Sequence, residues 1–582
     1  MRKNRITSAI GLSAVAALAL SACASTNTGT TANGGDTAAG DKSVSIAITN
    51  VFSSLNSGTA EGNSDTNGII AQMTHRGFLT ITDTFDLKKN EWFGSYTMTE
   101  EGEGIKVEYK VNDDQKWSDG NEIDKGDLLL AWASQSGYFN SEDGELTYFD
   151  YAGETAGLGG AGKPTMGEDG RTITFNYPVA FADWEIAYDI GKPAHVVAEL
   201  AGMDEAKLVE VLETAEPGAE NEDLKKIAEA WNTGYNTTTM PAENLTVGNG
   251  PYLVSAVEEN QSITLTANPN YQGDTKPAIG EVVLKVLPDV NAQIQALKNG
   301  EITAMAPQAS VDTITQLNEM DGVTTVTQPD QAYDHLDLNM KEGSPFADVN
   351  VRKAFLLTVP RQDILDKLIK PMDAEAEVLN SQLYVASDAA NYAKTVETNN
   401  SSEYPLDNMD ANIEKAKELL GGQTPTIRIL YNSKNPNRVN SFQMIKESAE
   451  KAGFIVEDAG SEQWSSLLSG GDYEASIFGW VSSGVGNSSL GQIFAAGSSS
   501  NFTSYNNEIV NAAADELMKT TDQARIDELK MQADAETFKD GYGLPLFQSI
   551  AVTSVADNVT GVKPKPGQQP LTWNIEEWDI AE

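Results

Sequence analysis

Cysteine and histidine are both rare in this 582-residue sequence, which contains one cysteine, Cys23, and three histidines, His75, His195 and His335. A single thiol excludes an internal disulfide. No histidine stands three or four residues from another histidine or from the cysteine, so the short-range spacings of zinc sites are absent. The sequence also contains no GxSxG or HExxH catalytic motif and no Walker-type glycine loop for phosphate. We therefore predict no catalytic residue, no metal, no cofactor and no enzymatic activity.

Basic residues are also few, because 40 lysines and arginines stand against 85 aspartates and glutamates, a formal net charge of −45. Nucleic-acid binding needs a basic face that replaces the counterions of phosphates. The composition therefore argues against a nucleic-acid partner, and solubility is enough to explain an acidic surface. Beyond the N-terminal segment, no stretch is apolar enough to cross a bilayer.

The N-terminus has the parts of an export signal: the cationic MRKNR, the apolar AIGLSAVAALAL and the small residues SAC. The residues LSAC, which end at Cys23, resemble the lipobox of bacterial lipoproteins, whose cysteine is diacylated. This resemblance implies a signal peptide over residues 1–22 and an extracytoplasmic protein anchored to the cell membrane through Cys23. Residues 23–43 lack apolar periodicity and are rich in Gly, Ser and Thr, which predicts a flexible tether. The alternative is a plain secretory signal with an incidental thiol.

Strand and helix patterns alternate along the rest of the chain. Residues 105–111, IKVEYKV, alternate as a half-solvated strand. Residues 426–432 have a strand pattern, 438–453 have apolar residues near one helical stripe, and FIVED follows as a second strand. Strand, helix and strand at this spacing predict a right-handed parallel crossover. The length predicts roughly three or four compact units, each able to bury its own core.

An alternating apolar run begins at Tyr473, ends at Trp480 and gives way to the neutral VSSGVGNSSL. Open α/β sheets bind ligands beyond the carboxyl ends of their strands. An indole can cover apolar ligand surface, and serine and glycine let backbone groups approach closely. We interpret the segment as the floor of a ligand cleft. The alternative is that Trp480 belongs to the core and that the loop is an ordinary solvent loop.

Six segments together resemble the bacterial extracellular solute-binding proteins of family 5, the oligopeptide- and dipeptide-binding components of ABC importers. In chain order they are NDDQKWSDGNEIDKGDLLLAW, VGNGPYLV, ANPNYQGDTKPAIGEVVLKVLPD, ALKNGEIT, SPFADVNVRKAFLLTVPRQDIL and YGLPLF. They follow the order of the family from about Leu55 to Phe547. Each match is weak alone, and their joint order is specific.

The resemblance implies an α/β fold with two lobes, like type II (cluster C) periplasmic binding proteins, with an extra inserted domain and closure as a hinged clamshell. On this mapping the first lobe comprises residues 44–62, 191–307 and 542–582, the inserted domain residues 63–190, and the second lobe residues 308–541. Ligand binding favours the shut state by its differential affinity for it. The implied partners are a small ligand, the permease and ATPase subunits of the transporter, and the membrane that holds the lipid anchor. A monomer is expected.

The resemblance also implies a ligand site, where a peptide backbone is held like an added β-strand and wet pockets tolerate varied side chains. The matching positions are Asn63 in the first lobe and Gly479, Trp480, Val481, Ser483 and Asn501 in the second. Peptide binders commonly carry a carboxylate three residues after the tryptophan, which pairs with the α-amino group of the ligand. This sequence has Ser483 there, and no acidic residue occurs between Glu474 and Glu508.

This departure leaves the ligand open. An acid of the first lobe such as Glu61 or Asp65, or carbonyls and water, could receive the amine. Alternatively the ligand lacks an amine, as in oligosaccharides or blocked peptides, for which tryptophan stacking suits well. We favour an oligopeptide, with an oligosaccharide or another neutral solute as the alternative. A peptide-signal receptor of the same architecture and, more remotely, a surface glycosidase are the other classes.

Overall fold

The computed structural model describes residues 42–141, 143–386, 388–481, 485–498, 500–567 and 571–581. The predicted signal peptide, Cys23 and all but the last two residues of the predicted tether lie outside these described residues. None of the helices within the described ranges has the length and apolar character of a membrane span.

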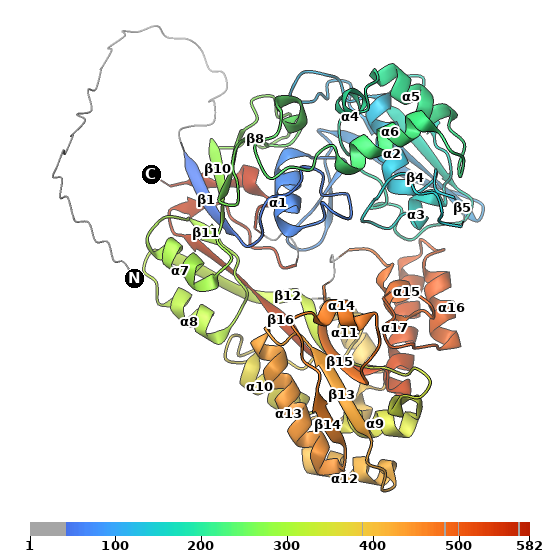
Figure 1. The fold of residues 1–582 in the computed structure, drawn as a ribbon, viewed down its shortest axis with the longest axis vertical. Coiled ribbons are helices and arrows are strands. Elements are labelled where there is room, and N and C mark those ends of the chain that lie inside the picture. The colour runs from blue at the N-terminus through green and yellow to red at the C-terminus, as the bar shows by residue number, and fades with distance from the viewer. Residues whose placement is uncertain are drawn as a thin grey trace, which may run out of the picture. The chain divides into compact units, whose positions relative to one another are not determined.

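A ten-stranded sheet runs through the described residues in the order β14-β13-β15-β12-β16-β11-β1-β10-β9-β8 (Figure 1). Its strands are β1 Ser43–Ile48, β8 Tyr252–Glu258, β9 Ser262–Ala267, β10 Glu281–Val286, β11 Ala304–Met305, β12 Val323–Leu338, β13 Thr426–Tyr431, β14 Ile455–Asp458, β15 Ala475–Val481 and β16 Gly543–Ala556. β1 pairs in parallel with β10 and β11, and β13 pairs in parallel with β14 and β15. The other neighbouring strands are antiparallel.

Two main groups of buried side chains lie along this sheet. The first includes Val44 and Leu284 and reaches into residues 555–578, and the second includes Leu336 and Ile429 and reaches residue 552. Two smaller groups pack beside the second. We call the elements around the first group the first lobe and the elements around the others the second lobe.

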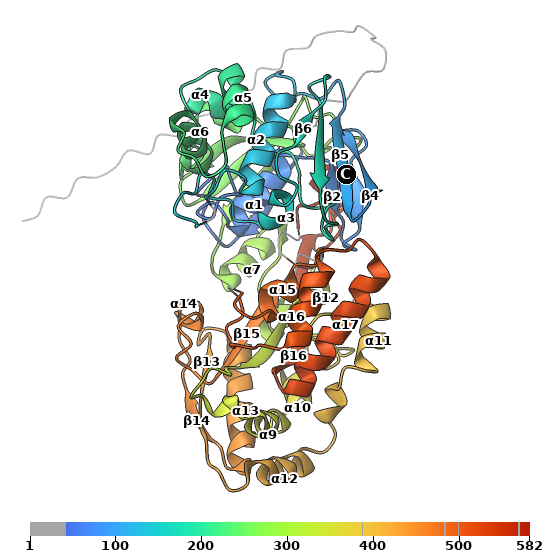
Figure 2. The ribbon, with the colours of Figure 1, turned by 90° about the vertical axis from the view of Figure 1, so that its right-hand side faces the viewer.

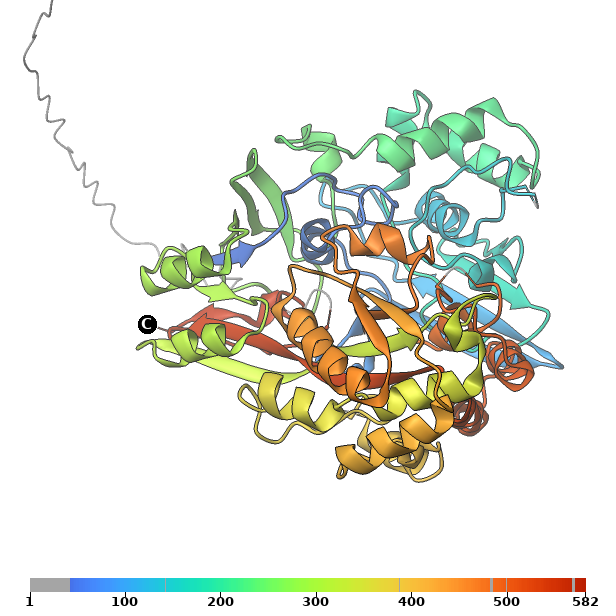
Figure 3. The ribbon, with the colours of Figure 1, turned by 60° about the horizontal axis from the view of Figure 1, so that its bottom comes forward.

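The long strands β12 and β16 connect the two lobes. They pair antiparallel from Val323 opposite Ala556 to Asp337 opposite Gly543, and Figure 3 shows them side by side. Along β16, Val552 packs into the buried group of the second lobe and Val555 into that of the first. The lobes are therefore joined by hydrogen-bonded strands.

The first lobe carries a second, four-stranded sheet and a layer of helices. The sheet has the order β4-β5-β7-β6, with β4 Gly94–Glu101, β5 Gly104–Val111, β6 Thr165–Met166 and β7 Thr172–Tyr177. Two short pairs complete the strands, β2 Leu79–Ile81 with β3 Leu87–Lys89 and β17 Val559–Thr560 with β18 Asp579–Ile580. The helices are α1 Asp65–Thr74, α2 Lys125–Ser136, α3 Ala156–Gly159, α4 Ala194–Leu200, α5 Glu205–Thr214 and α6 Glu222–Thr233, with 3-10 turns at Glu243–Thr246 and Ile575–Glu577.

Most of the remaining helices cover the sheet of the second lobe. They are α7 Val290–Lys298, α8 Val311–Asn318, α9 Val349–Leu357, α10 Arg361–Leu368, α11 Ala389–Val396, α12 Met409–Leu420, α13 Pro436–Ala452, α14 Trp464–Leu468, α15 Ser489–Phe494, α16 Glu508–Leu517 and α17 Gln523–Asp540, with 3-10 turns at Pro345–Ala347 and Ser401–Glu403. The helices α15, α16 and α17 pack together, as Figure 2 shows, around a buried group that includes Val510 and Leu529.

The local sequence patterns explain these elements. In β5 the apolar residues predicted for one face, Ile105, Val107, Tyr109 and Val111, are all buried. The predicted strand–helix–strand unit with parallel strands is confirmed, because α13 connects the parallel strands β13 and β14. Asn435 accepts hydrogen bonds at the start of α13, and Gly453 ends the helix at a φ of 109°. The predicted α/β class is thereby confirmed.

Candidate functional site

The indole of Trp480 lies half-buried within the second lobe. Trp480 is opposite Tyr333 in the β12–β15 ladder. Its ring is nearly parallel to those of His335 and Phe502, with centroids 5.8 Å and 6.2 Å away. The indole thus belongs partly to an aromatic group of the second lobe, and its role as a ligand surface remains a prediction.

A neighbouring ion pair explains why position 479 is a glycine. It lies opposite Asp334, whose carboxylate is bound by the Arg438 guanidinium at 2.9 Å and 3.0 Å. A Cβ on Gly479 would lie 2.8 Å from Asp334 Oδ1 and 2.9 Å from Arg438 Nη2. Glycine is therefore needed here for close approach of a mostly buried salt bridge.

Three adjoining cavities lie between or beside the lobes, and we call them together the cleft. The Val481 cavity, about 420 Å³, is lined by Asp65 and Leu571 of the first lobe and by Val481 and Ile550 of the second. The Lys530 cavity, about 620 Å³, is lined by residues of both lobes, among them Phe85 and Lys530.

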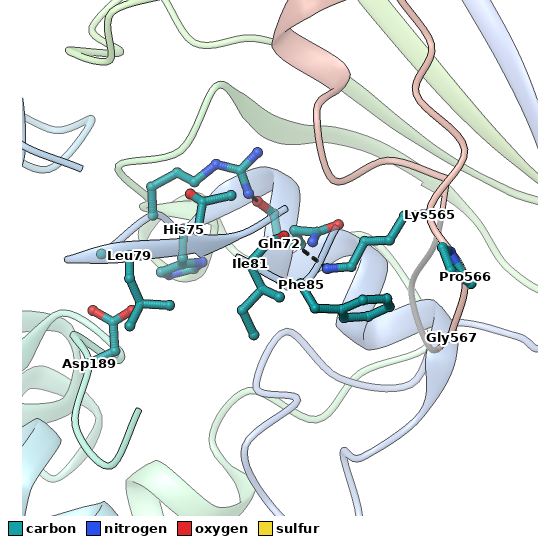
Figure 4. Close-up of a pocket in the computed structure, with 12 residues that line it drawn as sticks. Gln72, His75, Leu79, Ile81, Phe85, Asp189, Lys565, Pro566 and Gly567 are labelled. Atoms are coloured by element: carbon teal, nitrogen blue, oxygen red, sulfur yellow. Dashed lines mark hydrogen bonds between the residues drawn. The ribbon is translucent and has the colours of Figure 1, made fainter. Parts of the chain in front are cut away.

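The third cavity of the cleft, the Asp189 cavity, measures about 340 Å³ and lies in the first lobe (Figure 4). It shares Gly567 with the Val481 cavity, and Phe85 and Pro566 with the Lys530 cavity. The backbone N–H of Gly567 also donates a 2.6 Å hydrogen bond to Asp330 of β12. Residues 565–567 therefore connect the three cavities.

The structure brings only part of the predicted site to these cavities. Val481 lines the cleft and is 48% exposed. Asn63 is exposed and precedes α1. Asn501 uses its side-chain amide within its own loop, donating to the carbonyls of Ala495 and Tyr505 at 3.0 Å and 2.8 Å. Ser483 lies outside the described residues.

The segment after Trp480 is bound by the first lobe. Asp183 accepts hydrogen bonds from the backbone N–H and from Nδ2 of Asn487, both at 2.9 Å. The neighbouring Ala182 N–H donates to the Met518 carbonyl at 3.1 Å. We call this set of contacts the Asp183 latch, because it joins the lobes at the mouth of the cleft.

Asp189 is a partly buried carboxylate on the wall of the Asp189 cavity. Its Oδ1 accepts hydrogen bonds from the N–H groups of Phe78 and Ile190, at 2.9 Å and 2.8 Å. Burial raises the pKa of Asp189 to about 6, and these two hydrogen bonds offset part of that effect. The cavity therefore holds a carboxylate that is ionised at neutral pH.

The cations of the cleft are also desolvated. Lys565 donates to the Ile81 carbonyl at 2.9 Å, and burial lowers its pKa to about 8. Burial also lowers the pKa of Lys530, whose Nζ lies 5.8 Å from the centroid of the Tyr384 ring. The cleft thus presents both signs of charge, and the Lys530 cavity is lined by Lys530 together with Asp83 and Asp388.

The sequence reasoning did not identify Asp183 or Asp189 as site residues. Both stand in FADWEIAYDIGK without a motif, and their positions depend on how that segment folds against distant residues. The only sequence feature that could have pointed to these two residues is the alternation of Phe181, Trp184 and Tyr188 with acidic residues. This pattern does not by itself indicate a ligand site.

Comparison with known proteins places the chain in one family. The family model for bacterial extracellular solute-binding proteins, family 5 Middle, matches residues 91–502. The oligopeptide-binding protein OppA of Mycobacterium tuberculosis is 25% identical over 493 residues, which cover 83% of this chain and 76% of that protein. A lipoprotein of the same species, named as uncharacterized, is 24% identical over 507 residues, or 84% of each chain.

Solved structures share the fold. The periplasmic EDTA-binding protein EppA has a TM-score of 0.79 at 20% identity, covering 93% of this chain and 96% of its own. The oligopeptide-binding protein AppA of Bacillus subtilis, solved with a nonapeptide, has a TM-score of 0.66 at 18% identity, covering 93% and 99%. The two-lobed type II fold predicted from the sequence is confirmed.

Replacing Gly479 with alanine should destabilise the second lobe. The new Cβ would press on the Asp334–Arg438 pair, and overpacking of this kind costs about 1–3 kcal/mol. Chemical denaturation followed by tryptophan fluorescence measures the change. Gly491→Ala is the matched control, since a Cβ there comes no closer than 3.9 Å to another group. Equal stabilities of the two variants would contradict this account of Gly479.

Asp189→Asn should weaken the pH dependence of the free energy of unfolding. The folded protein holds the proton of Asp189 up to pH about 6, whereas the unfolded chain releases it near pH 4. The stabilising contribution of this proton is present below pH about 4 and is lost as the pH rises through about 6. The unchanged protein should therefore lose more stability than the variant between these values. Denaturation curves across that range test this, and parallel pH profiles would refute it.

Proposed function

Because the chain belongs to the bacterial extracellular solute-binding proteins of family 5, which bind small ligands such as peptides and deliver them to ABC permeases, we propose that it captures oligopeptides and hands them to a permease by closure of its lobes. The observation that carries this proposal is a cleft lined by both lobes and crossed by the paired strands β12 and β16. Ligand enclosed there contacts both lobes at once, so it favours the shut state.

Main-chain capture of an extended ligand is supported by the end of β15. The neighbouring strand β13 pairs only with Ala475–Ile477 of β15, whereas β12 pairs with the strand as far as Val481. Among the described strands, Gly479, Trp480 and Val481 therefore have a partner on one side only. An extended peptide can add to such an edge through backbone hydrogen bonds.

We propose that Gly479, Trp480 and Val481 form this edge, with Asn63 and Ser483 beside the ligand and Asn501 holding the nearby loop. Because the Trp480 side chain is half-buried, only its solvent-facing portion would contact the ligand. An oligosaccharide or another neutral solute is the second candidate. It is favoured by the absence of acidic residues between Glu474 and Glu508, and the EDTA-binding protein shows that the fold can bind a solute that is not a peptide.

The location and organisation predicted from the sequence are part of the proposal. The protein would be held outside the cytoplasm by a lipid on Cys23, as the lipoprotein relative supports. Residues 24–43 would act as a tether, and the protein would work as a monomer. The lobe boundaries of the sequence mapping, with residues 63–190 as an inserted domain, are also proposed, although α7 and residues 544–552 contribute side chains to the buried group of the second lobe.

Native mass spectrometry of the purified protein should show adducts with the masses of short peptides. A free peptide added at about 100 times its dissociation constant should stabilise the folded protein by about 2.7 kcal/mol, because it binds only that state. Thermal denaturation with peptide and oligosaccharide panels measures this effect. Stabilisation by oligosaccharides alone would replace the oligopeptide with the neutral-solute function.

Asp183→Asn should weaken ligand binding by about tenfold, because a carboxylate that accepts two hydrogen bonds stabilises the shut state by more than an amide. Calorimetric titration with a bound peptide identified by mass spectrometry measures the change. Asp150→Asn is the control, since Asp150 is an exposed aspartate of the same lobe. If both variants bind like the unchanged protein, the latch has no role in closure.

A further inference from the structure

Asp189 has no counter-charge among the described residues. Its Oδ1 accepts two backbone hydrogen bonds, and its Oδ2 accepts none from a described residue. Gly77 packs directly against the carboxylate, since a Cβ there would lie 1.7 Å from Oδ1. A carboxylate that is partly buried without a cation carries a desolvation cost, which the two backbone hydrogen bonds offset only in part.

The nearby cations are committed elsewhere. Arg76 binds Glu576 at 2.9 Å, and Lys192 donates to the carbonyl of Leu55. Lys565 donates to Ile81, and Figure 4 shows it with Pro566 on the side of the cavity away from Asp189. The charge of Asp189 is therefore available to a group that enters the cavity.

His75 adds a second acceptor to the same cavity. The Thr74 hydroxyl oxygen lies 2.8 Å from the Ile70 carbonyl oxygen and 2.9 Å from His75 Nδ1, and a hydroxyl that donates to the carbonyl accepts from a protonated Nδ1. The proton on Nδ1 leaves Nε2 as a bare acceptor, and this atom is buried without a hydrogen-bond partner among the described residues. Burial and the charge of Lys192 lower the pKa of His75 well below its usual value, so the ring is neutral.

We propose that the wall formed by Asp189 and His75, which we call the acceptor wall, binds an ammonium group of the ligand. Figure 4 shows both residues on one side of the cavity with Leu79 between them. An ammonium has three donors and a positive charge, and the wall offers a carboxylate and a lone pair. This inference rests on the proposed function, and it assigns the carboxylate that Ser483 does not supply.

The acceptor wall is better suited than the other acids of the first lobe. Glu61 accepts a 3.0 Å hydrogen bond from Asn236 and is exposed. Asp65 is exposed in the first turn of α1, where water and the helix terminus already stabilise its charge. Asp189 is the least exposed of the three, so it gains most from a cationic ligand.

The test compares amine and blocked forms of one probe. Pentaalanine, N-acetyl-pentaalanine and n-butylamine are titrated into the full-length protein and into Asp189→Asn by calorimetry at neutral pH. The asparagine oxygen can accept the same two backbone hydrogen bonds, so the variant is expected to fold. We expect it to lose at least about tenfold in affinity for pentaalanine and to be unchanged toward the acetylated peptide. Asp113→Asn, at an exposed aspartate, is the control.

The outcomes separate this inference from the proposed function. Equal affinity of the variant and the unchanged protein for pentaalanine, or a loss in Asp65→Asn instead, overturns the acceptor wall. If neither peptide binds the unchanged protein and the peptide panel also gives no stabilisation, the oligopeptide function is wrong, and n-butylamine alone decides the inference. The inference is then supported if n-butylamine raises the thermal stability of the unchanged protein more than that of Asp189→Asn. It is overturned if n-butylamine stabilises neither protein or stabilises both equally.

Discussion

The antiparallel pairing of β12 with β16 is the constraint on which the rest of this structure depends. Its hydrogen bonds continue from one lobe to the other, while the buried side chains of β16 change from one apolar group to the next between Val552 and Val555. The register shifts between Pro329 and Tyr333, and residues of this irregular stretch line the cleft. A bulged, twisted stretch of strand is where a sheet bends most readily. In the proposed closure, the lobes would move relative to each other without breaking the connection that positions their facing walls.

The distribution of charge across the cleft follows from that arrangement. The end of β15 carries no net charge. Gly479 leaves room there for the Asp334–Arg438 salt bridge, in which the two charges neutralise each other. The first lobe supplies Asp183 to the latch and Asp189 to the cavity wall, and Asp330 and Asp388 of the second lobe line the other two cavities. A further acid in the segment that contains Asn487 would oppose Asp183 as the lobes approach. The neutral sequence after Trp480 is thus consistent with a segment that must dock against an acidic partner.

Much of the fold could be predicted from the sequence, because it depends on local patterns. The alternation in β5, the caps of α13 and the crossover from β13 to β14 are short-range features, and the ordered family segments gave the architecture. The site could be predicted only in part. Val481 reaches the cleft. The side chain of Asn501, however, forms hydrogen bonds within its own loop, and Trp480 packs partly among aromatic rings. Asp189 could not be found in advance, because its proposed role depends on its packing beside Gly77 and on nearby cations that bind other groups, and neither is visible in a linear sequence.

The most direct test of the central claim is the distance between the lobes with and without ligand. Cysteines introduced at the exposed positions Ser95 in β4 and Ala512 in α16, with Cys23 replaced by serine, would carry spin labels for pulsed electron resonance. If β12 and β16 act as a hinge, the ligand-free protein should show a broad or longer distance that becomes short and narrow when peptide is added. An identical distance distribution in both states would contradict closure of the lobes around the ligand.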